Sequence, residues 1–385
     1  MDLRFIFIFN LNKMKKLLVI QIINSLSVGG AENIAKSIAL NLPDNTKPDN
    51  TKNEFIIFEN KISKSAKKEL ARKRIKVHRV LSSSFFSKQL AVYQLLSRRR
   101  PNLVHTHLGG LSYAFLSAKI LGIPVIHTIH SPLEGKNSLR IRYFHWLAFR
   151  LGATPVAVSS EVGKIAKKTF GLKNLIVINN GIDINYFTPP LNKIEEREKN
   201  NLPIHKKILI NIGNLKPVKN QRLIFKALSL LDHNDLFLLI VGNGELKNSL
   251  KEFGKKLGID NFRIITNCND AKRYLFASDI FILSSKSEGL PLSLLEAMAA
   301  KIPVISTKVG GMKKILIDHK NALTIRNDDA KALSSAISKL SANKVLRKKI
   351  ARCARKLVEE KFTLSNMVKL YWALYLKKIN ENSSI

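Results

Sequence analysis

The sequence predicts an α/β protein of two domains, each built on a parallel sheet. Short apolar runs rich in β-branched residues alternate with helical segments, and the clearest such unit spans residues 280–306. Two strands joined by a helix in this way form a parallel pair, because antiparallel strands need only a short turn. A chain of 385 residues also corresponds to two domains at about 150 residues each.

The unit at 280–306 reads as strand 280–283, polar loop 284–289, helix 292–300 and strand 302–306. Pro291 is expected at the first helical position, where a missing N–H costs nothing. The backbone N–H groups of Gly289, Leu290 and Leu292 are then expected to be free at the helix N-terminus, where an anion such as phosphate binds.

Two carboxylates mark the same unit: Glu288 in the loop and Glu296 in the helix. Carboxylates accept hydrogen bonds from hydroxyl groups, and the neighbouring helix N-terminus suits phosphate. A site for phosphate and hydroxyls together indicates a nucleotide-sugar ligand. The alternative is an ordinary α/β helix with two solvated glutamates.

The first half of the chain begins with strand 17–23, glycine loop 24–30 and a helix from Ala31. The tandem repeat PDNTKPDNTK at 43–52 predicts a surface loop. We then expect strands at 55–58, 76–80, 103–107, 125–129, 155–159 and 175–178, and helices at 63–74, 87–100 and 111–121.

Four histidines lie at the ends of two of these strands: His105 and His107, then His127 and His130. Ligands of open α/β sheets bind at the carboxyl ends of strands. A His-x-His pair can also chelate a metal, but no carboxylate or cysteine accompanies this one. Packing or hydrogen bonding is the expected role of His105, His107 and His127.

The second half begins after residues 188–207, a charged, proline-bearing segment that predicts an interdomain linker. Strands are expected at 208–212, 237–241 and 262–265, before the unit described above. Loop 213–220 carries Lys219, and the next strand leads to the GNGEL loop with Gly242 and Gly244. From Asp329 the chain is predicted to be mostly helical, and the last helix carries an aromatic stripe at Tyr371, Trp372 and Tyr375.

With these motifs in order, the chain resembles the retaining glycosyltransferases of the GT-B fold, family 4. Glu288 and Glu296 match the family's E-x7-E signature, GGAE at 29–32 its N-terminal loop, and His130 its sugar-contacting histidine. The resemblance covers most of the chain. It implies two Rossmann-like α/β domains whose parallel sheets face across a cleft, with the C-terminal helix crossing back to the N-terminal domain.

The resemblance implies an N-terminal acceptor-binding domain at 14–187, a linker at 188–207, a C-terminal nucleotide-sugar-binding domain at 208–365, and a final helix at 366–385 that packs back on the first domain. Residues 1–13 are predicted to be a dispensable extension, since MKKLLVIQII from Met14 resembles a more natural start than Met1. The active site is implied to lie between the domains, with hinge closure excluding water.

The implied reaction is metal-independent transfer of a hexosyl-type sugar from a nucleotide-sugar, with retention, and no cofactor. Catalytic roles fall on His130, Glu288 and Lys219: Lys219 meets the diphosphate, Glu288 the sugar hydroxyls, and His130 the sugar. Glu296 holds the ribose. The implied donor-binding residues are Gly29, Gly30, Asn214, Lys219, Gly242, Gly244, Glu288, Gly289, Leu290, Pro291 and Glu296.

The chain departs from the family pattern at two positions. Asn214 stands where the family has an arginine, which removes one charge from the expected diphosphate clamp, and Lys216 is a candidate substitute. Lys314 stands where a glutamate usually follows Gly310 and Gly311. The donor's sugar and base therefore stay open, as do the acceptor and the linkage.

Composition bears on partners and location. The net charge is +37 from 65 Lys and Arg against 28 Asp and Glu, and basic clusters lie at 61–79, 98–100 and 140–146. The last mixes basic and aromatic residues, as membrane-surface segments do. With two cysteines and no apolar run of about 20 residues, we expect a cytoplasmic protein, peripheral at the inner membrane face.

The acceptor is accordingly expected to be a glycan or a lipid-linked glycan of the lipopolysaccharide type, in cell-envelope polysaccharide synthesis. Two rivals remain. A nucleotide-sugar epimerase or a phosphorylase is compatible with the same fold. A basic nucleic-acid-binding protein fits the pI of about 10.2, although no zinc knuckle, RNA-binding aromatic motif or basic recognition helix accompanies it.

Overall fold

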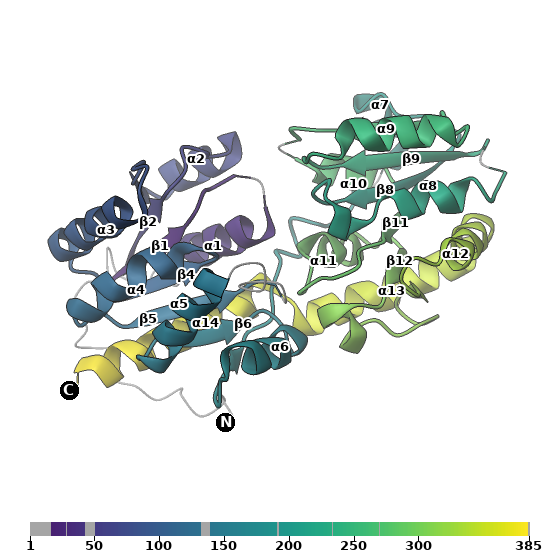
Figure 1. Cartoon of the computed structure of the whole chain (residues 1–385). Coiled ribbons are helices and arrows are strands. Elements are labelled where there is room, and N and C mark those ends of the chain that lie inside the picture. Colours follow the sequence, from purple (N-terminus) through teal and green to yellow (C-terminus); the bar gives the residue numbers. More distant parts are fainter. Residues whose placement is uncertain are drawn as a thin grey trace. The chain divides into compact units, whose positions relative to one another are not determined.

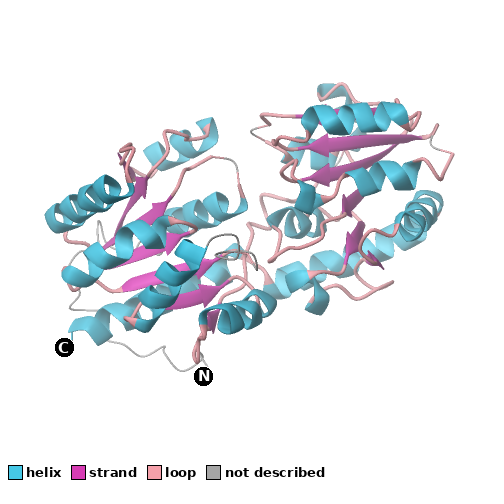
Figure 2. Ribbon diagram, in the orientation of Figure 1, coloured by secondary structure: helices cyan, strands magenta, loops and turns pink. Residues whose placement is uncertain are grey.

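The computed structural model describes residues 17–27, 29–42, 51–131, 139–190, 192–232, 234–268 and 270–383. The predicted extension 1–13 and residues 43–50 of the tandem repeat lie outside these ranges. The chain forms two compact units: one up to Asn180 together with the residues from Leu364, the other Gly181–Thr363. Each has its own sheet with helices around it (Figures 1 and 2).

The first unit contains a parallel sheet with strand order β3-β2-β1-β4-β5-β6-β7 over its described residues. Strands β2 and β3 lie on one side of β1, and β4 to β7 lie on its other side. The strand order therefore reverses between β1 and β4. The strands are β1 (Leu17–Ile23), β2 (Thr51–Ile57), β3 (Lys76–Arg79), β4 (Leu103–His107), β5 (Val125–Ile129), β6 (Thr154–Ala157) and β7 (Ile176–Val177).

Helices cover this sheet and include the last helix of the chain. Serine side chains cap three of them, Ser63, Ser84 and Ser159, each accepting a backbone N–H of the first turn. The helices are α1 (Gly30–Asn41), α2 (Lys64–Arg72), α3 (Phe85–Arg99), α4 (Gly110–Ile120), α5 (Leu139–Arg150), α6 (Ser160–Phe170) and α14 (Leu364–Ser383).

Strand β2 corrects one expectation. The tandem repeat was expected to be a loop through Lys52, but Thr51 and Lys52 are already strand and pair with Leu17 and Leu18 of β1. Backbone pairing with a buried neighbouring strand outweighs the polar composition of these two residues.

The second unit contains a parallel sheet with strand order β10-β9-β8-β11-β12-β13 over its described residues. The strand order again reverses, here between β8 and β11. Buried apolar side chains pack on both faces of the sheet. The strands are β8 (Lys207–Ile212), β9 (Leu236–Val241), β10 (Phe262–Ile265), β11 (Ile280–Leu283), β12 (Val304–Thr307) and β13 (Leu323–Ile325).

The helices of the second unit include two short 3-10 turns, η3 (Pro217–Lys219) and η4 (Gly310–Lys314). Pro291, expected at the first helical position, is instead the N-cap residue of α11, with an extended ψ of 129°. The α-helices are α7 (Lys193–Lys199), α8 (Arg222–Leu228), α9 (Lys247–Lys256), α10 (Lys272–Phe276), α11 (Leu292–Ala299), α12 (Ala330–Ala342) and α13 (Lys344–Lys361).

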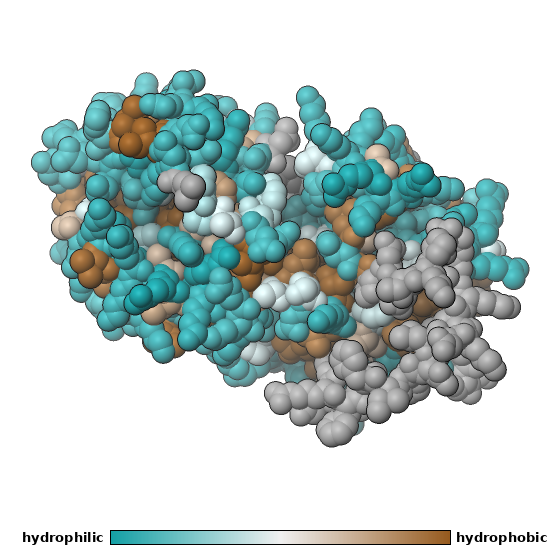
Figure 3. Space-filling model, turned by 180° about the vertical axis from the view of Figure 1, so that it is seen from behind, coloured by the Kyte–Doolittle hydropathy of each residue, from teal (hydrophilic) through white to brown (hydrophobic). Residues whose placement is uncertain are grey.

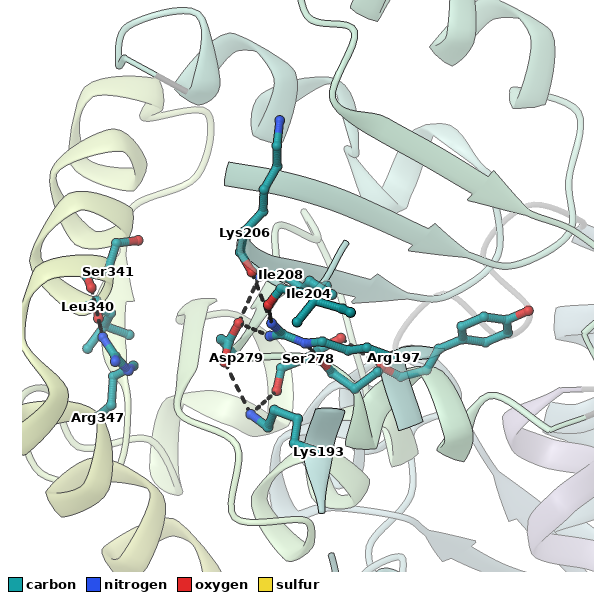
Figure 4. Close-up of polar contacts among 12 residues, drawn as sticks. Lys193, Arg197, Ile204, Lys206, Ile208, Ser278, Asp279, Leu340, Ser341 and Arg347 are labelled. Carbon is teal, nitrogen blue, oxygen red and sulfur yellow. Dashed lines mark hydrogen bonds and ion pairs between the residues drawn. The ribbon is translucent and has the colours of Figure 1, made fainter. Parts of the chain in front are cut away.

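Segment 188–207, expected to be a linker, contains helix α7 and belongs to the second unit. Buried Arg197 donates to the Ala277 carbonyl at 3.0 Å and to the Asp279 carboxylate at 2.5 Å (Figure 4). Lys193 donates to the Ser278 carbonyl at 2.7 Å. These side-chain bonds, which apolar periodicity does not reveal, attach the segment to the end of β11 nearest α10.

Candidate active site

The loop after β11 holds Glu288 in a fixed position. Its side chain is only 9% exposed, and Oε1 accepts a hydrogen bond from Ser285 Oγ at 2.6 Å. The same oxygen forms an ion pair with Lys219 Nζ. Thr307 of β12 donates to the Ser285 carbonyl at 2.7 Å, so the neighbouring strand supports the serine. Glu288 is therefore a charged acceptor whose orientation is set by its neighbours.

Lys219 ends η3, in the loop that follows β8. Two bonds tie this loop to the one after β11: Ser284 Oγ donates to the Lys219 carbonyl at 3.0 Å, and the Lys286 N–H donates to the Val218 carbonyl at 2.8 Å. Since β8 and β11 flank the reversal of strand order, Lys219 and Glu288 meet where ligands of open α/β sheets bind.

Asn214 begins the same loop and is exposed at its side chain. Gln221 donates to its backbone carbonyl at 3.1 Å. Lys216, the candidate substitute for the missing arginine, is also exposed. The structure therefore leaves both residues at the surface of the loop, and no contact among the described residues joins either side chain to Glu288.

Gly242 and Gly244 follow β9, beside the loop after β8. A Cβ on Gly242 would lie 1.9 Å from the Gly213 carbonyl oxygen, and one on Gly244 would lie 2.3 Å from that of Leu215. The Leu215 N–H also donates to the Asn243 carbonyl at 2.8 Å. Close packing of two backbones accounts for both glycines and brings the β9 loop to the same edge of the sheet.

The loop after β12 closes on Glu288 from the other side. The Gly311 N–H donates to the Gly289 carbonyl at 2.8 Å. Gly310 has φ +52°, and a Cβ there would lie 1.7 Å from the Glu288 carbonyl oxygen. Gly310 is therefore required both by its backbone conformation and by the space that Glu288 occupies.

Substitution of Gly310 by alanine tests this packing. Gly310→Ala adds a steric clash to left-handed strain, whereas Gly258→Ala adds strain alone, because Gly258 has φ +70° and open space around its Cβ position. Left-handed strain costs about 1–2 kcal/mol. We expect Gly310→Ala to lower the melting temperature clearly more than Gly258→Ala, measured by circular dichroism. Equal shifts would contradict the close approach to Glu288.

Glu296 lies in the second turn of α11 and is half-buried. Burial raises the pKa of its carboxyl to about 7. Over the described ranges its side chain has no hydrogen-bond or ion-pair partner. Leu290 and Pro291, also predicted at this site, lie between Glu288 and the first helical turn.

In the first unit the glycine loop opens α1 as expected. Gly29 is the N-cap residue and Gly30 the first residue of the helix. A Cβ on Gly29 would lie 2.2 Å from Oε2 of Glu32, so the glutamate side chain folds back over this position. Burial raises the pKa of Glu32, although its own backbone N–H and nearby serines oppose the shift.

His130 follows β5 at the carboxyl edge of the first sheet. Its Nε2 lies 3.0 Å from Nδ1 of His107. His105, His107 and His127 are fully buried and hydrogen-bonded, His127 to Thr106 Oγ1 at 2.9 Å. Within the described ranges, no three His, Cys, Asp or Glu residues are grouped to hold a metal ion.

The structure thus groups the predicted residues in two places. Lys219, Glu288, Gly289 and the close-packed glycines of the second unit share one sheet edge, and Gly29, Gly30 and His130 lie in the first unit. Sequence reasoning missed Ser285, although the pair of serines that follows the apolar strand 280–283 was a visible signal. It also missed Gln21, which lies inside an apolar strand and hydrogen-bonds to His107.

Two family models match the chain. "Glycosyltransferase Family 4" matches residues 28–186, and "Glycosyl transferases group 1" matches residues 192–357. The chain is 28% identical over 291 residues to the UDP-Gal:alpha-D-GlcNAc-diphosphoundecaprenol alpha-1,3-galactosyltransferase of Escherichia coli, which covers 70% of this chain and 74% of that relative.

Solved structures share the fold. A glycosyltransferase from Rickettsia africae has a TM-score of 0.78 at 23% identity, covering 96% of this chain and all of that one. Anabaena HepE in complex with UDP-glucose has a TM-score of 0.81 at 18% identity, covering 96% and 99%. The predicted fold class is confirmed. The chain belongs to the group 1 family of glycosyltransferases, family 4, and has the GT-B fold.

Proposed function

We propose that this glycosyltransferase moves a sugar from a nucleotide-sugar, with retention of configuration, to a glycan or lipid-linked acceptor of the cell envelope. The observation that carries the proposal is the Lys219–Glu288 pair at the switch point of the second sheet. The relatives support it: the Escherichia coli enzyme acts with UDP-Gal on a diphosphoundecaprenol-linked sugar, and HepE binds UDP-glucose.

The proposed chemistry follows from the charges. Breaking the anomeric C–O bond builds negative charge on the departing diphosphate, and the Lys219 ammonium stabilises it. The N-terminus of α11 contributes further positive potential. Glu288 accepts hydrogen bonds from the hydroxyl groups of the sugar, Glu296 binds the ribose, and His130 contacts the sugar.

When the acceptor attacks the anomeric carbon from the face on which the diphosphate departs, the configuration is retained. No carboxylate nucleophile of the glycosidase kind is then required. Because Lys219 and helix α11 supply the positive charge, we expect turnover without added metal ion or cofactor.

Donor turnover tests this function. UDP-, GDP- and ADP-sugars are incubated with the native chain in metal-free buffer, and free nucleotide is measured. We expect release from one donor and its loss in Glu288→Gln, which keeps the Ser285 bond but not the charge facing Lys219. An isomeric nucleotide-sugar formed without acceptor would indicate an epimerase instead. Absence of free nucleotide with every donor would reject the proposal.

We further propose that the first unit docks on an anionic membrane surface. Within the described ranges, none of the helices could span a membrane. Helices α3 and α5 expose Phe86 (76%), Leu90 (58%) and Tyr143 (58%), and the basic residues Lys88 and Arg142 neighbour them in the sequence. The face of the molecule shown in Figure 3 is largely hydrophilic and carries separate hydrophobic patches.

A liposome assay tests the membrane proposal. Each Lys or Arg near an anionic surface contributes about 1 kcal/mol. Sedimentation with anionic vesicles is expected, and it should be lost at about 1 M salt, where the Debye length is about 3 Å. Phe86→Ser should weaken it, whereas Val345→Ser, an equally exposed apolar position of the second unit, should not. Equal binding to neutral vesicles would contradict the proposal.

A further inference from the structure

A continuous chain of hydrogen bonds runs through the interior of the first unit. It starts at His130, passes through Tyr375 of α14 and ends at Tyr371 of the same helix. The six bonds are His130–His107 (3.0 Å), His107–Gln21 (2.9 Å), Gln21–Tyr375 (3.2 Å), Tyr375–His105 (2.5 Å), His105–Thr128 (2.7 Å) and Thr128–Tyr371 (2.9 Å). Every member after His130 is at most 1% exposed.

Sheet topology brings these residues together. Gln21 is on β1, His105 and His107 are on β4, and Thr128 is on β5, which are three adjacent strands. In the parallel register Gln21 stands opposite His105, and His107 stands opposite Thr128. Helix α14 packs on this part of the sheet and adds its two phenols. Residues far apart in the sequence thus build one buried polar network.

The donors and acceptors of this network define one direction. Burial is the main cause that holds the pKa of His105 and of His107 well below the usual value. Each ring is therefore neutral, with one N–H and one acceptor nitrogen. Gln21 turns its Oε1 to His107 and its Nε2 to Tyr375. His107 must then donate through Nε2 and accept through Nδ1.

Consequently His130 donates its Nε2–H to His107. At the other side of Gln21, the Tyr375 hydroxyl accepts from the amide and donates to His105 Nδ1, and His105 Nε2–H donates to Thr128. Each group has its partner in this direction. The opposite amide orientation would reverse every one of these bonds and move the His130 proton to Nδ1, so the state of Gln21 decides the tautomer of His130.

We infer that Gln21 and His107 are positioning residues for His130: they fix its ring orientation and place the proton of the neutral ring on Nε2. The lone pair of that ring is then on Nδ1. A fully satisfied buried network imposes a single arrangement, which an apolar core of equal volume would not do. The inference rests on the proposed function only for its kinetic test.

Imidazole nitrogen NMR tests the inference without any activity. In the native chain labelled with ¹⁵N-histidine, we expect His105, His107 and His130 to carry their proton on Nε2, each signal being assigned through a single His→Gln variant. In Gln21→Leu, the His107 and His130 signals should move toward a mixture of tautomers. A proton on Nδ1 of His130 in the native chain, or unchanged signals in Gln21→Leu, would overturn the inference.

The tyrosines of α14 offer a matched kinetic pair. Tyr371 and Tyr375 are both buried and lie four residues apart, and each loses only a hydroxyl on change to phenylalanine. Tyr375 contacts Gln21, whereas Tyr371 contacts Thr128 at the far end of the chain of bonds. Tyr375→Phe should lower kcat about 10-fold, as loss of a partner behind a functional residue does. Tyr371→Phe should retain kcat within about twofold.

His107 supplies the rescue experiment. His107→Leu should lower kcat by about 10–100-fold, and His107→Asn, which keeps an acceptor near the Nδ1 position, should recover part of it. Melting temperatures identify any variant that fails to fold. If the two tyrosine variants had equal kinetic effects, or if a folded His107→Asn recovered no activity, the network would have only a structural role and the positioning of His130 would be rejected. Absence of turnover in the native chain would reject the proposed function, whereas the NMR result would stand.

Discussion

Lys219→Met is expected to lower kcat by about 10²–10³-fold, the loss seen when a group that stabilises developing negative charge is removed. Lys219 is the cation held at the switch point of the second sheet, and its ammonium meets Glu288 there. Met retains the length of the apolar stem, so the change removes the charge and little packing. Steady-state kinetics with the donor identified by the turnover panel measures the effect.

Lys313→Met is the control for this experiment. Lys313 is an exposed lysine of η4, two residues after Gly311 in the loop that packs against Glu288. Removal of its charge should change kcat by less than about threefold, because it lies outside the bonded group around Glu288. If a folded Lys219→Met protein turns over donor at the native rate, another group stabilises the negative charge on the diphosphate.

Arg197→Met is expected to destabilise the second unit by about 3–5 kcal/mol, because it removes the hydrogen bonds of a buried guanidinium to Asp279 and to the Ala277 carbonyl, each involving a charged group and contributing about 1.5–3 kcal/mol. Arg197 is 8% exposed at its side chain and Asp279 is 16% exposed. Asp279 also accepts the Ile208 N–H at 2.8 Å and Lys193 at 3.2 Å. The arginine thus connects α7 to the beginnings of β8 and β11.

The two tryptophans allow this loss to be localised. Trp146 and Trp372 both belong to the first unit, so their fluorescence reports that unit in urea, whereas far-UV circular dichroism reports both. In Arg197→Met the dichroism transition should move to lower urea while the fluorescence transition stays. A loss below about 1 kcal/mol would mean that the segment 188–207 is only loosely attached.

The contacts of Asp279 make the loss of stability in Arg197→Met depend on pH. Burial by itself would raise the pKa of Asp279, but Lys193, the Ile208 N–H and Arg197 together lower it. A carboxylate with a depressed folded-state pKa contributes stability above its unfolded pKa of about 3.9 and loses it as the pH falls through the folded value. The stability difference between the native chain and Arg197→Met should therefore narrow below about pH 4.

The strands were largely predictable because apolar β-branched runs in a parallel sheet are buried on both faces. Residues 17–23, 103–107, 125–129 and 280–283 have the predicted bounds. Helix α7 was missed because it is held by polar side chains, chiefly Arg197, and not by an apolar stripe. Thr51 and Lys52 were missed because their strand depends on a neighbour far away in sequence.

At the site, the sequence predicted the important residue types but not their partners. Glu288 and Lys219 were named separately, and their ion pair follows from the adjacency of β8 and β11, which only the sheet order supplies. Gln21 could not be singled out, because the partners of a polar residue within a strand cannot be assigned until the order of the strands in the sheet is known. Its bonds to His107 and Tyr375 require the complete first unit, including α14.

Calorimetric titration with nucleoside diphosphates tests most directly whether the carboxyl edge of the second sheet is the donor site. UDP, GDP and ADP are titrated into the native chain and into Glu296→Ala, which removes the half-buried carboxyl of α11 and leaves the fold around it. We expect saturable binding of one nucleotide to the native chain, weakened by about 10-fold or more in the variant, as for a lost hydrogen bond to a charged group. Equal affinity in the two proteins, or no saturable binding of any nucleotide, would contradict the assignment.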